Sequence, residues 1–138
     1  MRFRETYVLD ANAILDYLED GPGAAILQRL LREASRNGTA LMISVINLGE
    51  VYYQLYRSKG EQEARRSVDD LARLPMQFVA VDLAHVLKAG ELKARHKLPY
   101  VDCIAAALAI EQQATLVTAD RDFEKLGRQF PILWISRH

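Results

Sequence analysis

Four acidic residues stand at points of the sequence where a carboxylate could do chemistry. Asp10 follows the short apolar run "YVL", and Asp120 comes two residues after the run "LVT". Glu50 and Asp102 lie early in two helical stretches, "SVINLGEVYYQLY" and "PYVDCIAAALAIEQQA". Clustered carboxylates repel one another, and the pKa of each rises unless a cation compensates the charge. Because Mg²⁺ and Mn²⁺ prefer oxygen ligands, the four acids predict a divalent metal site if the fold brings them together.

Asp102 is the most informative of the four, because the helix predicted around it is apolar on almost every side. Ile104, Leu108 and Ile110 accompany a run of alanines in this stretch. The helix dipole stabilises a carboxylate in the first turn by about 0.5 kcal/mol, whereas removal from water costs several times as much unless a cation or a donor compensates. Metal binding is one natural compensation.

The other three acids also have purely structural interpretations. Asp10 could cap the following helix, although Asn12 could cap it equally well. Glu50 could lie on a solvated helix face within two turns of Arg57. Asp120 could belong to a turn that caps a helix after a strand. Each interpretation stays open when its residue is considered alone.

Five short β-rich apolar runs alternate with helical stretches along the chain. The runs comprise residues 7–9, 41–43, 78–81, 116–118 and 132–135, and the helical stretches comprise residues 13–20, 23–36, 45–57, 61–73, 83–96, 99–113 and 121–127. Such alternation predicts an α/β fold with a mostly parallel sheet and helices on both faces. In such sheets the ligand crevice lies beyond the carboxyl ends of the strands. We therefore expect Asp10, Ser44, Thr118 and Asp120 at one edge.

Size and composition limit the other classes of function. The chain has 138 residues, half of them hydrophobic, and no repeat or linker, which predicts a single domain over residues 1–138. Eighteen Lys and Arg balance eighteen Asp and Glu, so a polyanionic partner must be held by local basic patches or by metal ions. The single cysteine excludes an internal disulfide, and no segment resembles a signal peptide or a membrane span. We expect a cytoplasmic protein without a membrane partner.

Other catalytic chemistry is not indicated. His85 and His96 lack the spacing of zinc ligands and are expected to ride on a helix face. Cys103 is expected to be a small buried side chain beside Asp102, because no histidine partner is indicated. The sequence also lacks a glycine-rich phosphate loop.

Four segments together resemble the motifs of a known nuclease family. "VLDANAIL", "ISVINLGEV", "LPYVDCIAAALA" and "LVTADRDF" are similar, in order and in spacing, to the motifs of PIN-domain nucleases, and specifically of the free-standing toxin subfamily VapC. The resemblance covers the whole chain and implies a PIN-like three-layer sandwich. It also implies an acid cluster that binds magnesium or manganese, formed here by Asp10, Glu50, Asp102 and Asp120. The matching supporting positions are Asn12, Ser44, Thr118 and Asp122.

One position departs from the family pattern. Ala11 stands where a residue with a hydroxyl group is frequent, so polar support at this point must come from Asn12.

The resemblance implies an endoribonuclease that hydrolyses phosphodiester bonds in RNA and acts as the toxin of a toxin-antitoxin pair. The residue types agree with this chemistry, because metal ions neutralise the phosphate, lower the pKa of a water molecule and stabilise the leaving oxygen. Lys93, Arg95 and Lys97 are candidates to contact RNA phosphates. Each of them could equally be a solvated helix end.

The implied partners are the RNA substrate, a VapB-like antitoxin whose tail covers the active site, and a second copy of the chain in a homodimer. Apolar residues of the early helices, such as Leu27, Leu30 and Leu31, offer a surface for a partner, although a deeply packed core would explain most of them.

Three other functions were weighed against this one. A housekeeping RNA-processing PIN nuclease would have the same acids. A PIN-like domain that only binds RNA or protein is disfavoured, because all four acids are present. A phosphoacceptor signalling domain is also a small parallel α/β fold, but it needs a second acid beside Asp10 and a lysine after the last strand, and "ANA" and "ILWISRH" supply neither.

Overall fold

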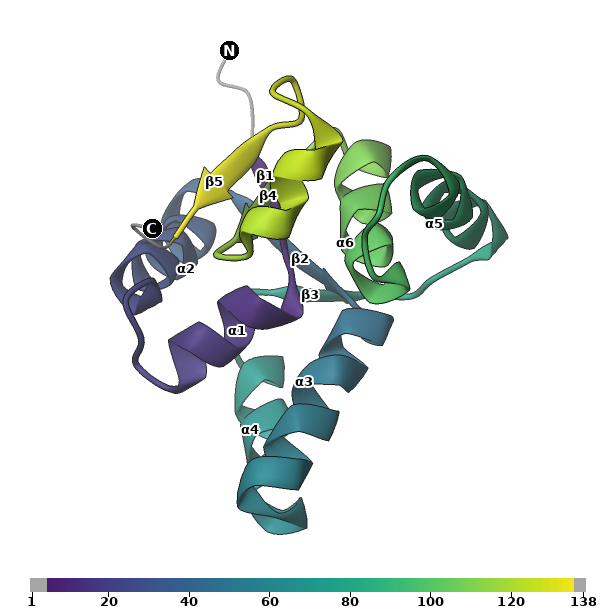
Figure 1. Ribbon diagram of the computed structural model, residues 1–138. Coiled ribbons are helices and arrows are strands. Elements are labelled where there is room, and N and C mark those ends of the chain that lie inside the picture. Colours follow the sequence, from purple (N-terminus) through teal and green to yellow (C-terminus); the bar gives the residue numbers. More distant parts are fainter. Residues whose placement is uncertain (1–4, 136–138) are drawn as a thin grey trace.

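The computed structural model describes residues 5–135, which form a parallel sheet between two layers of helices (Figure 1). The strands are β1 (Thr6–Leu9), β2 (Ala40–Ser44), β3 (Gln77–Val79), β4 (Thr115–Thr118) and β5 (Ile132–Trp134). They lie in the order β3-β2-β1-β4-β5, and each neighbouring pair is parallel. The predicted α/β fold with a mostly parallel sheet is confirmed.

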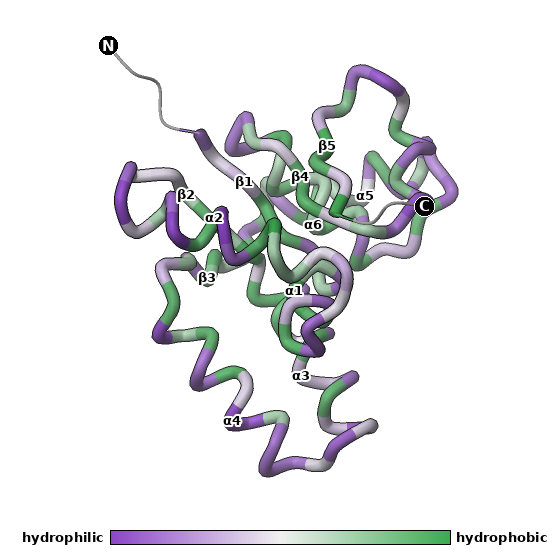
Figure 2. The backbone as a smooth tube through the Cα atoms, turned by 90° about the vertical axis from the view of Figure 1, so that its left-hand side faces the viewer, coloured by the Kyte–Doolittle hydropathy of each residue, from purple (hydrophilic) through white to green (hydrophobic). Residues whose placement is uncertain are grey.

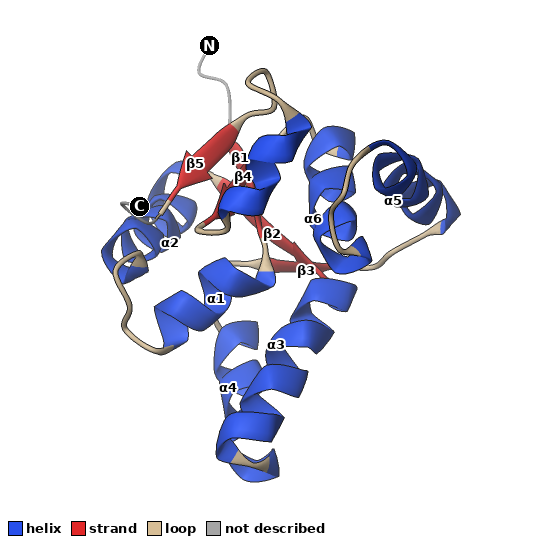
Figure 3. Ribbon diagram, in the orientation of Figure 1, coloured by secondary structure: helices blue, strands red, loops and turns tan. Residues whose placement is uncertain are grey.

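The helices cover both faces of this sheet (Figure 3). They are α1 (Ala11–Leu18), α2 (Ala24–Asn37), α3 (Val45–Lys59), α4 (Glu61–Ala72), α5 (Leu83–Arg95), α6 (Tyr100–Glu111) and the short 3-10 helix η1 (Arg121–Leu126). Within residues 5–135, none of these helices has the length and apolar character needed to cross a membrane.

Alternate residues of the central strands supply two separate hydrophobic cores. Leu9 and Val117 pack with α1 to α4, whereas Val8 and Leu116 pack with α5, α6 and η1. Successive side chains of a strand point to opposite faces, so both faces of β1 and β4 are buried. Figure 2 shows hydrophobic positions gathered at the middle of the sheet, whereas hydrophilic positions alternate with hydrophobic ones along α4.

Helix α6 is buried on nearly every side, as its composition predicts. Cys103 is fully buried in it, which confirms the expectation for this residue. His85 does lie on a helix face, but the face is the buried one. Its Nε2 lies 2.9 Å from the carbonyl oxygen of Ile104. Because a carbonyl only accepts, Nε2 carries the proton, and His85 joins α5 to α6.

Two helix predictions need correction. Helix α1 begins at Ala11 rather than at residue 13, because Asp10 caps it directly. Residues 121–126 form a 3-10 helix rather than a longer α-helix. It ends at Gly127, whose φ of 96° is a conformation that glycine adopts without strain.

Candidate active site

A pocket of about 170 Å³ opens at the carboxyl edge of the sheet, and all four predicted acids line it. The lining residues are Asp10, Ala11, Asn12, Glu50, Gln54, Pro99, Val101, Asp102 and Asp120. They come from the β1–α1 junction, from α3, from the start of α6 and from the loop after β4. The fold thus brings together acids that are far apart in the sequence. Asn12 joins them, whereas Ser44, Thr118 and Asp122 are not part of this wall.

Asp10 is held from two sides at the end of β1. Its Oδ1 accepts the backbone N–H of Ala13 at 2.8 Å, and its Oδ2 accepts the hydroxyl of Thr118 at 2.5 Å. The same Thr118 oxygen accepts the backbone N–H of Asp120 at 2.9 Å. Thr118 therefore fixes Asp10 and the loop that carries Asp120 in one arrangement.

Asp10 is also the N-cap of α1, so its structural interpretation is confirmed while the residue still lines the acid pocket. The prediction that Asn12 could cap this helix equally well is wrong, because Asn12 lies inside the helix and is exposed. Only 3% of Asp10 is exposed. The pKa of Asp10 is raised to about 7, mainly by burial. The charges of Asp102 and Asp120 contribute to this rise, and the two hydrogen bonds oppose it.

The other acids share this electrostatic environment. The pKa of Asp102 is also raised to about 7. Burial is the largest cause, and the negative charges of Asp120, Glu50 and Asp122 contribute the rest. Burial also raises the pKa of Glu50. The carboxylates repel one another across the pocket, which is the condition that a cation relieves.

The chemistry of the donors fits a hard divalent ion. Among residues 5–135, no three His, Cys, Asp or Glu side chains are arranged to hold a metal ion as they stand. The acids share the pocket wall without converging on one point. All ionisable donors in the wall are carboxylates, with the amides of Asn12 and Gln54 beside them. Mg²⁺ keeps several of its waters, so a few carboxylates suffice to bind it.

The sequence model of the PIN domain family matches residues 7–129. The chain belongs to the PIN domain family. No curated protein sequence matched the chain.

Solved structures of similar fold agree with this membership. The VapBC2 complex of Rickettsia felis, bound to a promoter DNA fragment, contains a chain with a TM-score of 0.75 and 21% identity, over 93% of this chain and 97% of that one. The DNA-bound VapBC complex of Salmonella typhimurium gives 0.73 and 21%, over 96% and 99%. The sarcin-ricin loop cleaving toxin VapC20 of Mycobacterium tuberculosis gives 0.69 and 20%, over 88% and 95%. The PIN-like fold is therefore confirmed.

In this PIN domain Ser44 supports the site indirectly, through a residue that the sequence analysis missed. Ser44 caps α3 by accepting the backbone N–H of Asn47 at 3.0 Å, and its hydroxyl donates to Asn47 Oδ1 at 2.6 Å. Asn47 Nδ2 donates to the carbonyl of Val101 at 2.9 Å, one residue before Asp102. Both polar side chains are buried. They join the start of α3 to the first turn of α6.

A signal for this role exists in the sequence. Asn47 lies in the same i, i+4 row as Val51 and Leu55, which are buried, so the pattern places an amide among core positions. A buried amide needs hydrogen-bond partners from the protein, because solvent does not reach it there. The row alone does not identify the partner, which comes from another helix.

We expect Asn47→Ala to lower the free energy of unfolding by about 1–3 kcal/mol, because it leaves the Ser44 hydroxyl and the Val101 carbonyl without their partner. Urea denaturation measures the change. Asn37→Ala is the matched control, since Asn37 is an exposed amide at the end of α2. Equal losses in the two variants would contradict the role assigned to Asn47.

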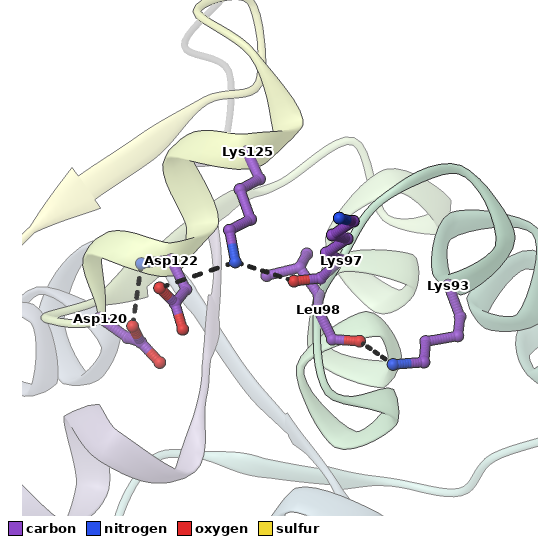
Figure 4. Close-up of polar contacts among 6 residues, drawn as sticks. All are labelled: Lys93, Lys97, Leu98, Asp120, Asp122 and Lys125. Atoms are coloured by element: carbon purple, nitrogen blue, oxygen red, sulfur yellow. Dashed lines mark hydrogen bonds and ion pairs between the residues drawn. The ribbon is translucent and has the colours of Figure 1, made fainter.

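Two lysines tie down the loop that precedes α6 (Figure 4). Lys93 Nζ donates to the carbonyl of Leu98 at 2.7 Å, and Lys125 Nζ donates to the carbonyl of Lys97 at 2.9 Å. Lys125 also lies 3.9 Å from Asp122 Oδ1, so it joins η1 to this loop. Asp122 itself meets one of the four acids through its backbone N–H, which donates to Asp120 Oδ1 at 2.9 Å.

These contacts bear on the residues predicted to contact RNA. Lys93 has a structural partner, and Arg95 forms an ion pair with Glu91 at 3.4 Å. Lys97 uses its backbone carbonyl in the loop, and its side chain is exposed beside η1 (Figure 4). The side chains of Lys93 and Arg95 would thus exchange a described contact for an RNA phosphate, whereas the described contact of Lys97 uses its backbone.

Proposed function

We propose that this PIN domain is a metal-dependent endoribonuclease and acts as the toxin of a toxin-antitoxin pair. The observation that carries the proposal is the pocket in which carboxylates from four separate segments meet. The names of the similar structures add support, since they include VapBC complexes and a toxin that cleaves the sarcin-ricin loop of RNA. Hydrolysis of a phosphodiester is the reaction that such an acid cluster serves best.

In this proposal Asp10, Glu50, Asp102 and Asp120 hold Mg²⁺ or Mn²⁺. A bound ion of this kind neutralises phosphate charge and lowers the pKa of a water molecule. Thr118 and the Ala13 N–H each occupy one lone pair of Asp10, so the carboxylate is fixed in direction and keeps lone pairs for a ligand. Asp102 belongs to the first turn of α6, a helix whose following residues are buried.

The direct test measures cleavage of a structured RNA by the purified chain. We expect EDTA to stop cleavage, and excess Mg²⁺ or Mn²⁺ to restore it, because the carboxylates then regain their counter-ion. Zn²⁺ is the comparison metal. Cleavage that persists in EDTA, or that returns with Zn²⁺ alone, would contradict the proposed site.

The proposal includes cytoplasmic action, a homodimer and a VapB-like antitoxin. The apolar residues of the early helices do not supply the partner surface, because Ile14, Leu27 and Leu30 are buried in the core. Large exposed apolar side chains lie elsewhere, on α3, α5 and α6. They are Val45, Ile46, Tyr53, Tyr56, Leu83, Leu87, Tyr100 and Ile110. These residues support association, since exposed apolar patches mark protein contacts.

We expect the chain to copurify with the product of a small reading frame just upstream when a tag is placed on one of the two. Expression of the chain alone should stop growth, and the Asp102→Asn variant should be tolerated. If nothing copurifies, and cells tolerate the active chain as a monomer, the toxin role is wrong and a housekeeping RNA-processing nuclease takes its place.

A further inference from the structure

A second pocket, of about 440 Å³, is lined by residues of η1, of β5 and of the turn that joins them. Its wall includes Trp134 and Phe130 as aromatic residues, Pro131 from the turn, and Arg128 and Glu124 as charged residues. None of these residues lines the acid pocket. The combination of flat apolar rings with a guanidinium is unusual for a pocket that only fills space between elements.

Trp134 carries the strongest indication of a ligand. The guanidinium carbon of Arg121 lies 4.3 Å from the centroid of the Trp134 ring, which is the geometry of a cation–π contact. The indole is only partly buried, and part of it faces the pocket. Aromatic rings next to arginine are the surfaces on which proteins stack the bases of single-stranded nucleic acid.

One end of the second pocket, at Trp134, reaches the carboxyl edge of the sheet, whereas the turn before β5 lies at the opposite edge. In the β4–β5 pair Trp134 is the register partner of Thr118, whose hydroxyl binds Asp10. Paired strands are about 4.8 Å apart. Arg121 directly follows Asp120, one of the four acids. An RNA strand that passes the acids can therefore reach this pocket along the start of η1.

The charges of the wall favour a base over a phosphate inside the pocket. The carboxylate of Glu124 repels a phosphate but accepts a hydrogen bond from the N–H groups of a base. Arg128 in the wall and Arg121 against the Trp134 ring supply positive charge on the two sides of the indole's pocket. Another polypeptide strand could pair with β5, but the strand is only three residues long and offers a short edge.

We propose that the Trp134 end of this pocket binds a nucleobase of the single-stranded RNA substrate that passes the acid pocket. Trp134 stacks on the base, and Arg121 and Arg128 contact the flanking phosphates. The inference rests on the proposed nuclease function, because RNA is the ligand that both pockets would share.

The chain has one tryptophan, so intrinsic fluorescence reports on this pocket alone. Short single-stranded oligocytidylate is titrated in EDTA, so that the RNA stays intact, and anisotropy of a labelled copy gives the affinity. We expect fluorescence to be quenched as RNA binds. Trp134→Ala should weaken binding about 10-fold, as should Arg121→Ala, whereas Trp134→Phe should keep most of the affinity. Arg29→Ala, on α2, is the matched control.

Three results would overturn the inference. Fluorescence could stay constant while anisotropy reports binding, inorganic polyphosphate could quench as strongly as RNA, or Trp134→Ala and Arg121→Ala could bind RNA like Arg29→Ala. If Trp134→Ala does not fold, Arg121→Ala still decides the matter. Quenching by RNA in a chain that never cleaves would overturn the nuclease proposal and keep the pocket. Cleavage in Mg²⁺ without quenching would do the reverse.

Discussion

The Asp102→Asn variant is expected to lose RNA cleavage by at least about 100-fold. A carboxylate that binds a catalytic ion contributes several kcal/mol to the transition state, and about 3 kcal/mol corresponds to that factor. Asparagine has nearly the same shape, so α6 keeps its packing. The same loss is expected for Asp10→Asn, because asparagine still offers one oxygen to the Ala13 N–H but has no charge.

Cleavage rates under substrate excess measure this loss, and circular dichroism checks that the variants are folded. Asp69→Asn is the matched control, since Asp69 is an exposed acid on α4 outside the acid pocket. Full activity in Asp102→Asn would remove Asp102 from the active site. A similar loss in Asp69→Asn would show that the assay responds to charge in general.

In metal-free buffer, Asp10 should make the protein less stable as the pH rises from about 4 to 7. The folded-state pKa of Asp10 is about 7, above its ordinary value of 3.8. Between these values the folded state keeps a proton that the unfolded state releases, so a rise in pH favours unfolding. For this buried carboxyl we expect an effect on the order of 4 kcal/mol, about 1.4 kcal/mol for each unit of the pKa difference. Asp102 adds less, because solvent screens its half-buried carboxyl.

The difference between the wild type and Asp10→Asn isolates this effect from other titrating groups. Urea denaturation at several pH values should find the variant more stable at pH 7 and the two chains similar near pH 4. Saturating Mg²⁺ should reduce this difference in stability, because the ion binds the folded wild type with Asp10 ionised and stabilises it. If the stabilities of the two chains change in parallel with pH over this range, ionisation of Asp10 does not destabilise the folded state.

Local pattern predicted the elements well where burial alone decides them. The apolar runs around Val8 and Leu116 are strands because both of their faces are covered, and α6 is buried because no side of it is polar. The same reasoning placed the acids at strand ends. Their meeting in one pocket follows from the parallel order of the strands, which the alternation of elements had predicted.

Features that depend on partners distant in the sequence could not be predicted. Asp10 caps α1 and binds Thr118, a residue 108 positions away, and no local pattern distinguishes it from Asn12 as a cap. The helical row of Asn47 indicates a buried amide, but its partner, the Val101 carbonyl, comes from another helix. The contact of Lys93 with the Leu98 carbonyl was not predicted either, and the RNA contact of Lys93 stays a prediction.

The position of β4 between β1 and β5 determines when the acid pocket forms during synthesis of the chain. The first half of the protein contains β1 and β2, which pair with each other, Asp10 directly after β1, and Glu50 on α3. Thr118 and Asp120 are made much later, and only then does β1 gain its second neighbour. A growing chain that stops before β4 therefore lacks both the residue that orients Asp10 and one of the four acids. Because contacts so distant in sequence close late, a nascent chain carries an incomplete acid pocket until β4 has been inserted into the sheet.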